Sequence, residues 1–136
     1  MVFGLFKKSS NEEVVTTYGD VVVVSLQKSA YYADSRDELL KTVQGAVEQS
    51  PSSKVVIDMS KVKQFTSGPL GALVVSARKA EDGNGQLVIA AAVSNFVGKV
   101  LSTATEAKKS PSFPNVRGAL AALSTEAASA YDKAQS

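Results

Sequence analysis

The chain has 136 residues, 44% of them hydrophobic and 21% charged, which is typical of a single globular domain. A domain of this size buries roughly two-thirds of the surface of its unfolded chain, so it needs no disulfide or structural metal to be stable. The sequence contains no cysteine, histidine or tryptophan, which excludes Ser-His-Asp and Cys-His catalysis and metal binding through thiolate or imidazole groups. The formal net charge of +2, with both signs interspersed, argues against nucleic-acid binding.

Residues 1–12 are expected to form an N-terminal arm. The arm carries the large apolar side chains of Val2, Phe3, Leu5 and Phe6, followed by two lysines. This apolar run is too short for a secretory signal or a membrane span, so we expect a cytoplasmic protein. The arm either folds back onto the domain or contacts a membrane surface or a partner protein.

Valine-rich segments begin the main domain, for which we expect the boundaries 13–123. Residues 13–17 and 21–26 flank Tyr18-Gly19-Asp20, which has turn chemistry, so the two segments are predicted to form a hairpin. The run Val21–Val24 shows no alternation of apolar and polar residues. Both faces of this strand should therefore be covered, as in a central strand with helices on each side.

The next segments predict a helix and a parallel strand. Ser35 and Glu38 have the spacing of a capping box, and the residues after them recur at helical spacing up to the polar cluster 50–53. Residues 55–57 form a buried strand that ends at Asp58. Strand, helix and strand in this order predict a right-handed crossover with parallel strands. Residues 29–33 and 61–65 are expected to be loops.

Two further helices and one further strand follow. Residues 69–80 predict a helix capped by Ser67 or Gly68, and residues 82–85 end it with turn chemistry. Residues 87–93 predict a third apolar strand, and Ser94 is expected to cap the next helix. That helix carries the apolar residues Phe96, Val97, Val100 and Leu101.

The last part of the chain predicts a loop and a final helix. Residues 108–114 are expected to be a loop with at most a short strand at Phe113, and Asn115 is expected to cap the helix that follows. Residues 124–136 are expected to be a helical or frayed tail. Alternating strands and helices predict an α/β sandwich whose mixed, mostly parallel sheet is covered by helices.

Few groups in the sequence predict catalytic chemistry. Asp58 lies where receiver domains carry their phosphoacceptor, but the carboxylates of a Mg²⁺ site are missing after the first strand, so we expect it to cap its loop. Gly83 and Gly85 follow a helix and precede a strand, the reverse of a phosphate-binding loop. We therefore expect no catalytic residues, no bound metal, no cofactor and no small-molecule substrate.

The most informative segment is residues 65–71, Phe-Thr-Ser-Gly-Pro-Leu-Gly. Thr66 and Ser67 lie where a loop becomes a helix, and amides at a helix start favour an added negative charge. A phosphate on either hydroxyl would add about −1.5 to −2 units of charge to a nearly neutral surface. The spacing alone favours the other interpretation, in which Ser67 is an ordinary N-cap serine.

The sequence resembles the STAS domain of bacterial anti-sigma factor antagonists from about Val14 to Leu123. The resemblance rests on four segments in the same order and spacing as in that family. These are Val55-Val56-Ile57-Asp58-Met59-Ser60, Phe65–Gly71, Gln86-Leu87-Val88-Ile89 and Phe113–Leu120.

The resemblance implies a phosphorylation site and a partner. In the family the loop typically reads Asp-Ser-Ser-Gly-Leu-Gly, and Ser67 falls on the serine that a partner kinase, itself the anti-sigma factor, phosphorylates. Thr66 replaces the aspartate, Gly68 the second serine and Pro69 the first glycine. Either the phosphoswitch is kept with a different specificity, with Thr66 as the second candidate acceptor, or the domain binds its partner constitutively. The implied docking residues are Thr66, Ser67, Gly68, Pro69 and Leu70.

Two other classes of function remain open. The domain could be a non-catalytic scaffold subunit of a membrane transport or signalling assembly, using the same helix surface and the arm. A nucleotide-binding or enzymatic role has the least support, because no phosphate loop, metal ligands or poised base are visible in the sequence.

Overall fold

The computed structural model describes residues 5–7, 13–106 and 111–136, the first of these by backbone alone. The N-terminal half contains β1 (Leu5–Lys7), β2 (Val14–Tyr18), β3 (Val21–Ser25), β4 (Ala30–Tyr31), the 3₁₀ turn η1 (Ala33–Ser35), α1 (Arg36–Gln49), β5 (Lys54–Asp58) and β6 (Gln64–Phe65). The C-terminal half contains α2 (Ser67–Asp82), β7 (Gln86–Ala90), α3 (Asn95–Ala104), β8 (Ser112–Phe113), α4 (Val116–Leu123) and α5 (Thr125–Gln135).

The main sheet has the strand order β1-β2-β3-β5-β7-β8. The pairs β1–β2 and β2–β3 are antiparallel, and β3–β5, β5–β7 and β7–β8 are parallel. The predicted hairpin, the parallel crossover and the mixed, mostly parallel sheet are therefore confirmed. From the N-terminal arm, residues 5–7 pair with β2, whereas Phe3 lies outside the described residues, as do residues 108–110 of the predicted loop.

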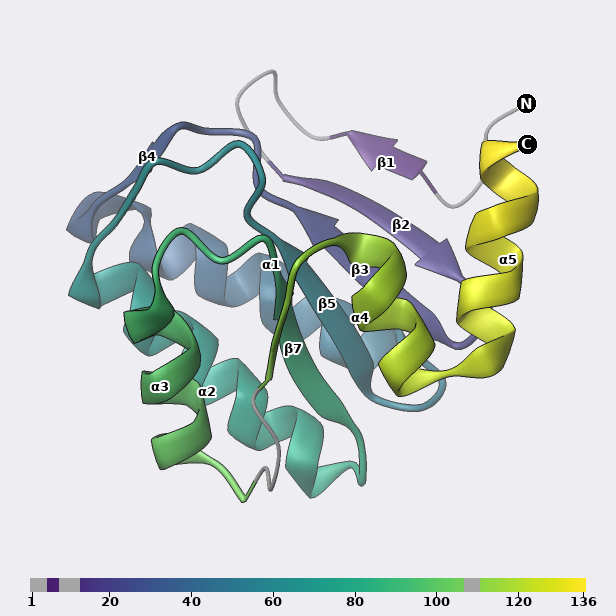
Figure 1. The fold of residues 1–136 in the computed structure, drawn as a ribbon. Coiled ribbons are helices and arrows are strands. Elements are labelled where there is room, and N and C mark those ends of the chain that lie inside the picture. The colour runs from purple at the N-terminus through teal and green to yellow at the C-terminus, as the bar shows by residue number, and fades with distance from the viewer. Residues whose placement is uncertain (1–4, 8–12, 107–110) are drawn as a thin grey trace.

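Helices cover both faces of the sheet, as the unbroken valine run predicts. Val22 and Val24 pack in one hydrophobic cluster with α1 and α2, whereas Val21 and Val23 pack in a second cluster with α4 and α5. In Figure 1, α4 and α5 lie in front of the sheet and α1 and α2 lie behind it. The side chains of all four valines are at most 3% exposed. Burial on two faces makes β3, β5 and β7 the buried centre of the fold.

Three local predictions outside α2 were wrong. Ser35 does not form a capping box, because η1 runs directly into α1 and leaves Ser35 in helical conformation (φ −89°, ψ −9°) with no side-chain cap. The two segments predicted as loops pair with each other as the short parallel strands β4 and β6. The third apolar strand ends at Ala90, because Ala91 adopts a φ of +54° and leaves the extended conformation.

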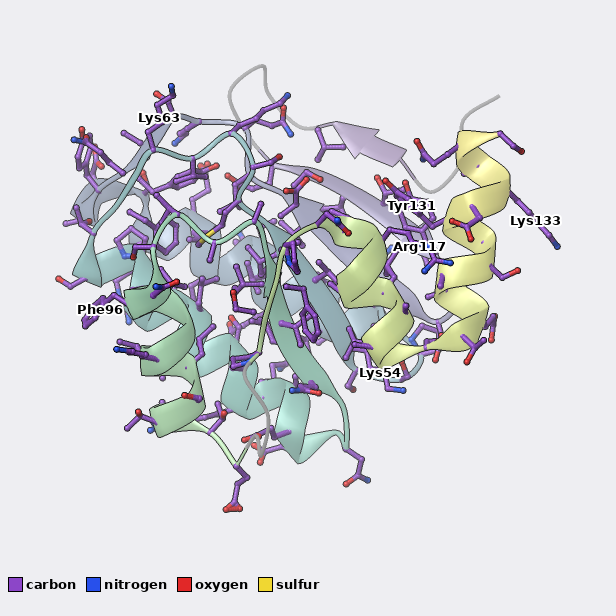
Figure 2. The ribbon with its side chains drawn as sticks, in the orientation of Figure 1. Lys54, Lys63, Phe96, Arg117, Tyr131 and Lys133 are labelled. Carbon is purple, nitrogen blue, oxygen red and sulfur yellow. The ribbon has the colours of Figure 1, made fainter. Side chains whose placement is uncertain are left out.

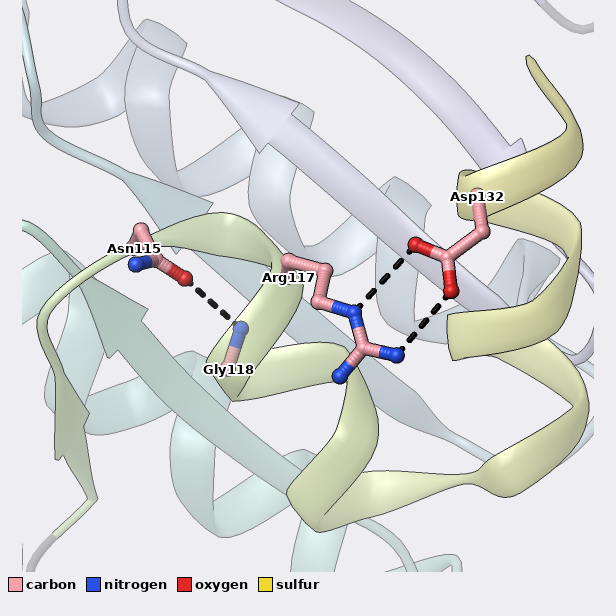
Figure 3. A network of polar contacts seen from close by, with 4 residues as sticks. All are labelled: Asn115, Arg117, Gly118 and Asp132. Atoms are coloured by element: carbon pink, nitrogen blue, oxygen red, sulfur yellow. Dashed lines mark hydrogen bonds and ion pairs between the residues drawn. The ribbon is translucent and has the colours of Figure 1, made fainter. Parts of the chain in front are cut away.

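Residues 124–136 neither extend α4 nor fray; they form a separate helix, α5, that packs beside β2. Its start depends on Ser124, whose hydroxyl donates to Asp20 Oδ1 (2.6 Å) and accepts from the Ala127 amide (3.2 Å). Figure 3 shows a second link, in which Arg117 of α4 binds Asp132 of α5 through two N–H···O contacts of 3.2 and 3.0 Å. The same figure shows the predicted Asn115 cap, whose Oδ1 accepts from the Gly118 amide (2.8 Å).

Gly85 occupies a position that no other residue can fill. A Cβ built there would lie 2.0 Å from the backbone oxygen of Ser53, which cannot move without disturbing the start of β5. We expect Gly85→Ala to lower the free energy of unfolding by about 3 kcal/mol in urea denaturation. The control is Gly45→Ala, on an exposed turn of α1 with open space around it, which should raise stability by about 0.5–1 kcal/mol. Equal effects of the two substitutions would contradict this packing.

Ser124→Ala tests the attachment of α5. The Ser124 hydroxyl is the main cause of the lowered pKa of Asp20, so the variant should raise that pKa toward its ordinary value of about 3.9. Loss of the cap should also cost about 1–2 kcal/mol of stability near neutral pH.

Because the folded-state pKa of Asp20 is lowered, its contribution is present above the unfolded pKa and is lost as the pH falls through the folded value. The difference between wild type and Ser124→Ala should therefore shrink below about pH 4. Ser129→Ala, on the exposed face of α5, is the control and should change neither quantity. An unchanged Asp20 titration, followed by NMR, would show that the hydroxyl contact is absent in solution.

Candidate functional site

The start of α2 carries the residues that the sequence singles out. Its N-cap is Thr66, in extended conformation, and not Ser67 or Gly68 as predicted. The Thr66 side chain does not bond the helix amides; its hydroxyl donates to the carbonyl oxygen of Tyr31 (3.1 Å), and its amide donates to the same oxygen (3.0 Å). The helix start is thus fastened to β4 by two hydrogen bonds from one residue.

Ser67 is the first residue of α2, and its side chain is exposed. Within the described part of the chain, its hydroxyl makes no hydrogen bond. The amides of Ser67 and Gly68 lie in the first turn, where an α-helix offers no carbonyl partner, and Pro69 contributes no N–H at the third position. The end of α2 therefore presents a free hydroxyl together with unpaired amides, an arrangement that favours negative charge.

The other predicted docking residues lie deeper in the structure. Pro69 and Leu70 are buried, and Leu70 is 6% exposed and part of the hydrophobic core. Gly68 is half-buried, and a Cβ there would lie 3.2 Å from Ala33 Cα, so the glycine lets η1 approach α2 closely. At this end of α2, Thr66 and Ser67 are exposed and Gly68 is partly exposed. Pro69 and Leu70 hold these residues in place from below.

Tyr31 anchors the site to the sheet. Its side chain is fully buried and lies 5.6 Å from the ring of Phe65, centroid to centroid. Its hydroxyl donates to Glu13 Oε2 (3.1 Å) and accepts from the Gln27 amide (3.2 Å). Burial raises the pKa of this phenol far above its ordinary value, so Tyr31 stays a neutral hydrogen-bond donor.

The charges around the site are few and mixed. Arg36 flanks Gly68 and bonds Asp37 (3.0 Å), and Figure 2 shows Lys63 on the loop that leads to β6. Asp58 Oδ1 accepts from the Ser60 amide (3.0 Å), which confirms its predicted role as a cap of the loop. A phosphate added at Ser67 would therefore be the largest charge in this part of the surface.

Sequence reasoning did not indicate the exposure of the Phe96 side chain. Of the apolar residues predicted on this helix, Val97 and Leu101 are buried, whereas Phe96 is 63% exposed. The spacing of the apolar residues in α3 fits two different faces, so the pattern alone does not show which one packs on the core.

Comparison with known proteins decides the family. The model of the STAS domain matches residues 13–119, most of the chain. The chain belongs to the STAS domain family. Among proteins whose functions have been curated, none matches the chain in sequence.

Several solved structures share the fold of this STAS domain. A putative anti-sigma factor antagonist from Thermotoga maritima is 17% identical, with a TM-score of 0.62 over 80% of this chain and 92% of that one. The anti-sigma factor antagonist SpoIIAA, in its unphosphorylated form, is 13% identical, with a TM-score of 0.59 over 90% and 97% of the two chains.

The murine anion transporter Slc26a9 is 19% identical, with a TM-score of 0.57, and the match covers 79% of this chain and 18% of the transporter. The STAS domain thus corresponds to a small part of that much longer protein. Among the described residues of our chain, no helix is long and apolar enough to cross a membrane.

Thr66 and Ser67 should respond differently to substitution. Thr66→Val removes the hydroxyl that donates to the Tyr31 carbonyl and should lower the free energy of unfolding by about 1 kcal/mol. Thr66→Ser retains that hydroxyl and should leave the free energy of unfolding unchanged. Ser67→Ala should change stability by less than about 0.5 kcal/mol, because none of the described residues forms a hydrogen bond with the Ser67 hydroxyl. Chemical denaturation of the three variants tests this, and a larger loss for Ser67→Ala than for Thr66→Val would reverse the assignment.

Proposed function

We propose that this STAS domain acts as an anti-sigma factor antagonist. It docks through the start of α2 on an anti-sigma factor that is also a serine kinase, and phosphorylation of Ser67 ends the docking. The observation that supports this most is the exposed, unbonded hydroxyl of Ser67 at the first position of α2. The family membership and the structural likeness to anti-sigma factor antagonists agree with it.

The proposed switch is electrostatic. Ser67 Oγ would attack the terminal phosphorus of ATP held by the kinase, losing its proton to a base of that enzyme, and ADP would leave. The phosphate would bring about −1.5 to −2 units of charge to a surface that must dock closely on a protein. Burying that charge in the interface would cost desolvation energy, so the complex would dissociate.

Ser67 suits this role better than Thr66. The Thr66 hydroxyl donates to the Tyr31 carbonyl, so a phosphate on Thr66 would break the contact that holds the helix start. A phosphate on Ser67 would break no hydrogen bond in the described part of the chain, and the free amides of the first turn would stabilise it. The switch could then operate without unfolding the domain.

In this proposal the chain is a substrate and a binding partner and performs no catalysis itself. The kinase supplies ATP, Mg²⁺ and the catalytic base, so the domain would need no cofactor or metal of its own. We place this exchange of partners in the cytoplasm, where an anti-sigma factor would meet its sigma factor.

A scaffold role in a membrane transport or signalling assembly is the second candidate. One observation favours it, namely the shared fold with the part of the anion transporter that matches this chain. The two roles differ in what the chain should bind: a kinase whose affinity depends on Ser67, or a membrane protein whose affinity does not.

The direct test compares Ser67→Ala with Ser67→Asp. The partner is first isolated on the tagged wild-type chain from the cells that produce it and identified by mass spectrometry, and its affinity for each variant is then measured by calorimetry. We expect Ser67→Ala to bind like the wild type and Ser67→Asp to bind about tenfold more weakly or worse. Ser67→Asp should nevertheless be at least as stable as the wild type, because an acidic residue in the first turn favours the helix.

Ser129→Asp is the matched control, since it adds the same charge at an exposed serine of α5, on the opposite face of the sheet. It should leave the affinity unchanged. Equal affinity of Ser67→Ala and Ser67→Asp for a kinase partner would contradict the proposed phosphorylation switch. Recovery of a membrane transport protein that binds both variants equally would favour the scaffold role instead.

A further inference from the structure

α3 carries a stripe of side chains on its outer side, in which Phe96, Lys99 and Thr103 are exposed and Val100 is partly buried against the core. Its inward face is formed by Val97 and Leu101, which are buried. A second set recurs at positions i, i+3, i+4, i+7 and i+8 and therefore lines one outer face of the helix. This set consists of Phe96, Lys99, Val100, Thr103 and Ala104. Figure 2 shows Phe96 projecting from α3 away from the sheet.

These residues and Arg78 of α2 line an open groove of about 500 Å³. Arg78 crosses from α2 to α3, where its Nε donates to the carbonyl oxygen of Ala104 (3.1 Å). The apolar part of the groove is formed by Phe96 and Val100, and its polar rim by Arg78 and Lys99. An exposed aromatic ring beside an arginine is the composition typical of the energetic centre of a protein interface.

Among the described residues, neither cation of the groove has a carboxylate partner, although Arg78 donates a hydrogen bond to the Ala104 carbonyl oxygen. Within residues 13–106 and 111–136, neither Arg78 nor Lys99 forms an ion pair, although Arg36, Lys79 and Arg117 each do. Two unpaired cations beside an exposed apolar surface complement a ligand that carries both carboxylates and apolar side chains.

The groove also continues a surface that begins at Ser67. Along α2, the helical spacing places Ser67, Gly71, Val75 and Arg78 on one face, and Val75 is an exposed apolar residue (39%). Arg78 lies about 16 Å from Ser67 at the helical rise per residue. One partner could therefore contact both ends of this face.

We propose that the groove between α2 and α3 binds an acidic, amphipathic helix of the protein that docks at Ser67, with the Phe96 ring as the apolar anchor and Lys99 and Arg78 facing its carboxylates. This inference rests on the proposed function for the identity of the partner, but not for the chemistry of the groove. A helix fits because a concave site between two helices accepts the apolar residues of a third at i, i+3, i+4 spacing. A membrane surface fits less well, since it requires a protruding apolar face and a larger cluster of basic residues.

The test uses peptides as probes and does not need the natural partner. A phage-displayed library of helical peptides is selected on the wild-type chain, with counter-selection on Phe96→Ala, which removes an exposed ring and should leave the fold intact. We expect enrichment of peptides that combine Asp or Glu with large apolar residues. One enriched peptide, labelled with a fluorophore, then reports affinity by anisotropy.

We expect Phe96→Ala and Lys99→Glu each to weaken this peptide about tenfold or more, and high salt to weaken it further. Lys133→Glu, an exposed lysine of α5 on the other side of the molecule (Figure 2), is the control and should have no effect. Ser67→Asp should change the affinity less than about twofold, because Ser67 lies about three helical turns from Arg78. The proposal for the groove and the proposal for the Ser67 switch can thus be contradicted independently of each other.

Four results would overturn the proposal. They are no enrichment over Phe96→Ala, enrichment of peptides without acidic residues, concentration-dependent dimerisation abolished by Phe96→Ala in sedimentation, and binding to anionic lipid vesicles abolished by the same substitution. The last two would assign the groove to a second copy of the chain or to a lipid surface.

Discussion

The fold depends on the burial of the apolar residues of three parallel strands on both faces of the sheet. The side chains of β3, β5 and β7 point alternately into two hydrophobic clusters, so helices must cover both faces of the sheet. Parallel strands require long connections, and the one that leaves the carboxyl end of β5 carries residues 59–66 and then α2. The position of Ser67 is therefore set by the sheet. Its place at an exposed helix start follows from how that connection is held.

The connection is held by neighbours of Ser67 and leaves Ser67 itself free. Thr66 bonds the Tyr31 carbonyl, Tyr31 is buried beside Phe65, and Leu70 lies in the core. Each structural task at the helix start thus falls to a different residue from the one proposed to take the phosphate. A chain without histidine or cysteine can serve as a regulated binding surface. Such a surface needs an accessible hydroxyl on a well-placed helix start and no catalytic side chain of its own.

The sequence predicted what depends on local or repeated patterns and missed what depends on distant contacts. The valine run predicted two-sided burial because burial acts on every residue of the strand, and Asn115 predicted its cap because the interaction spans three residues. Ser35 failed as a cap because the preceding 3₁₀ turn fixed its backbone. The pairing of β4 with β6 joins distant segments, and the exposure of Phe96 depends on which face of α3 the core occupies. For the candidate site, the sequence singled out residues 65–71, and the structure was needed to separate buried Pro69 and Leu70 from exposed Ser67.

Phosphate occupancy at Ser67 in the native chain is the most direct measure of whether docking is switched there. The chain would be purified from the cells that produce it, separated into partner-bound and free pools by size, and analysed by fragmentation mass spectrometry that distinguishes Ser67 from Thr66. We expect phosphate on Ser67 in the free pool and almost none in the bound pool. Absence of phosphate from both pools, or equal occupancy in the two, would contradict a phosphorylation switch at the start of α2.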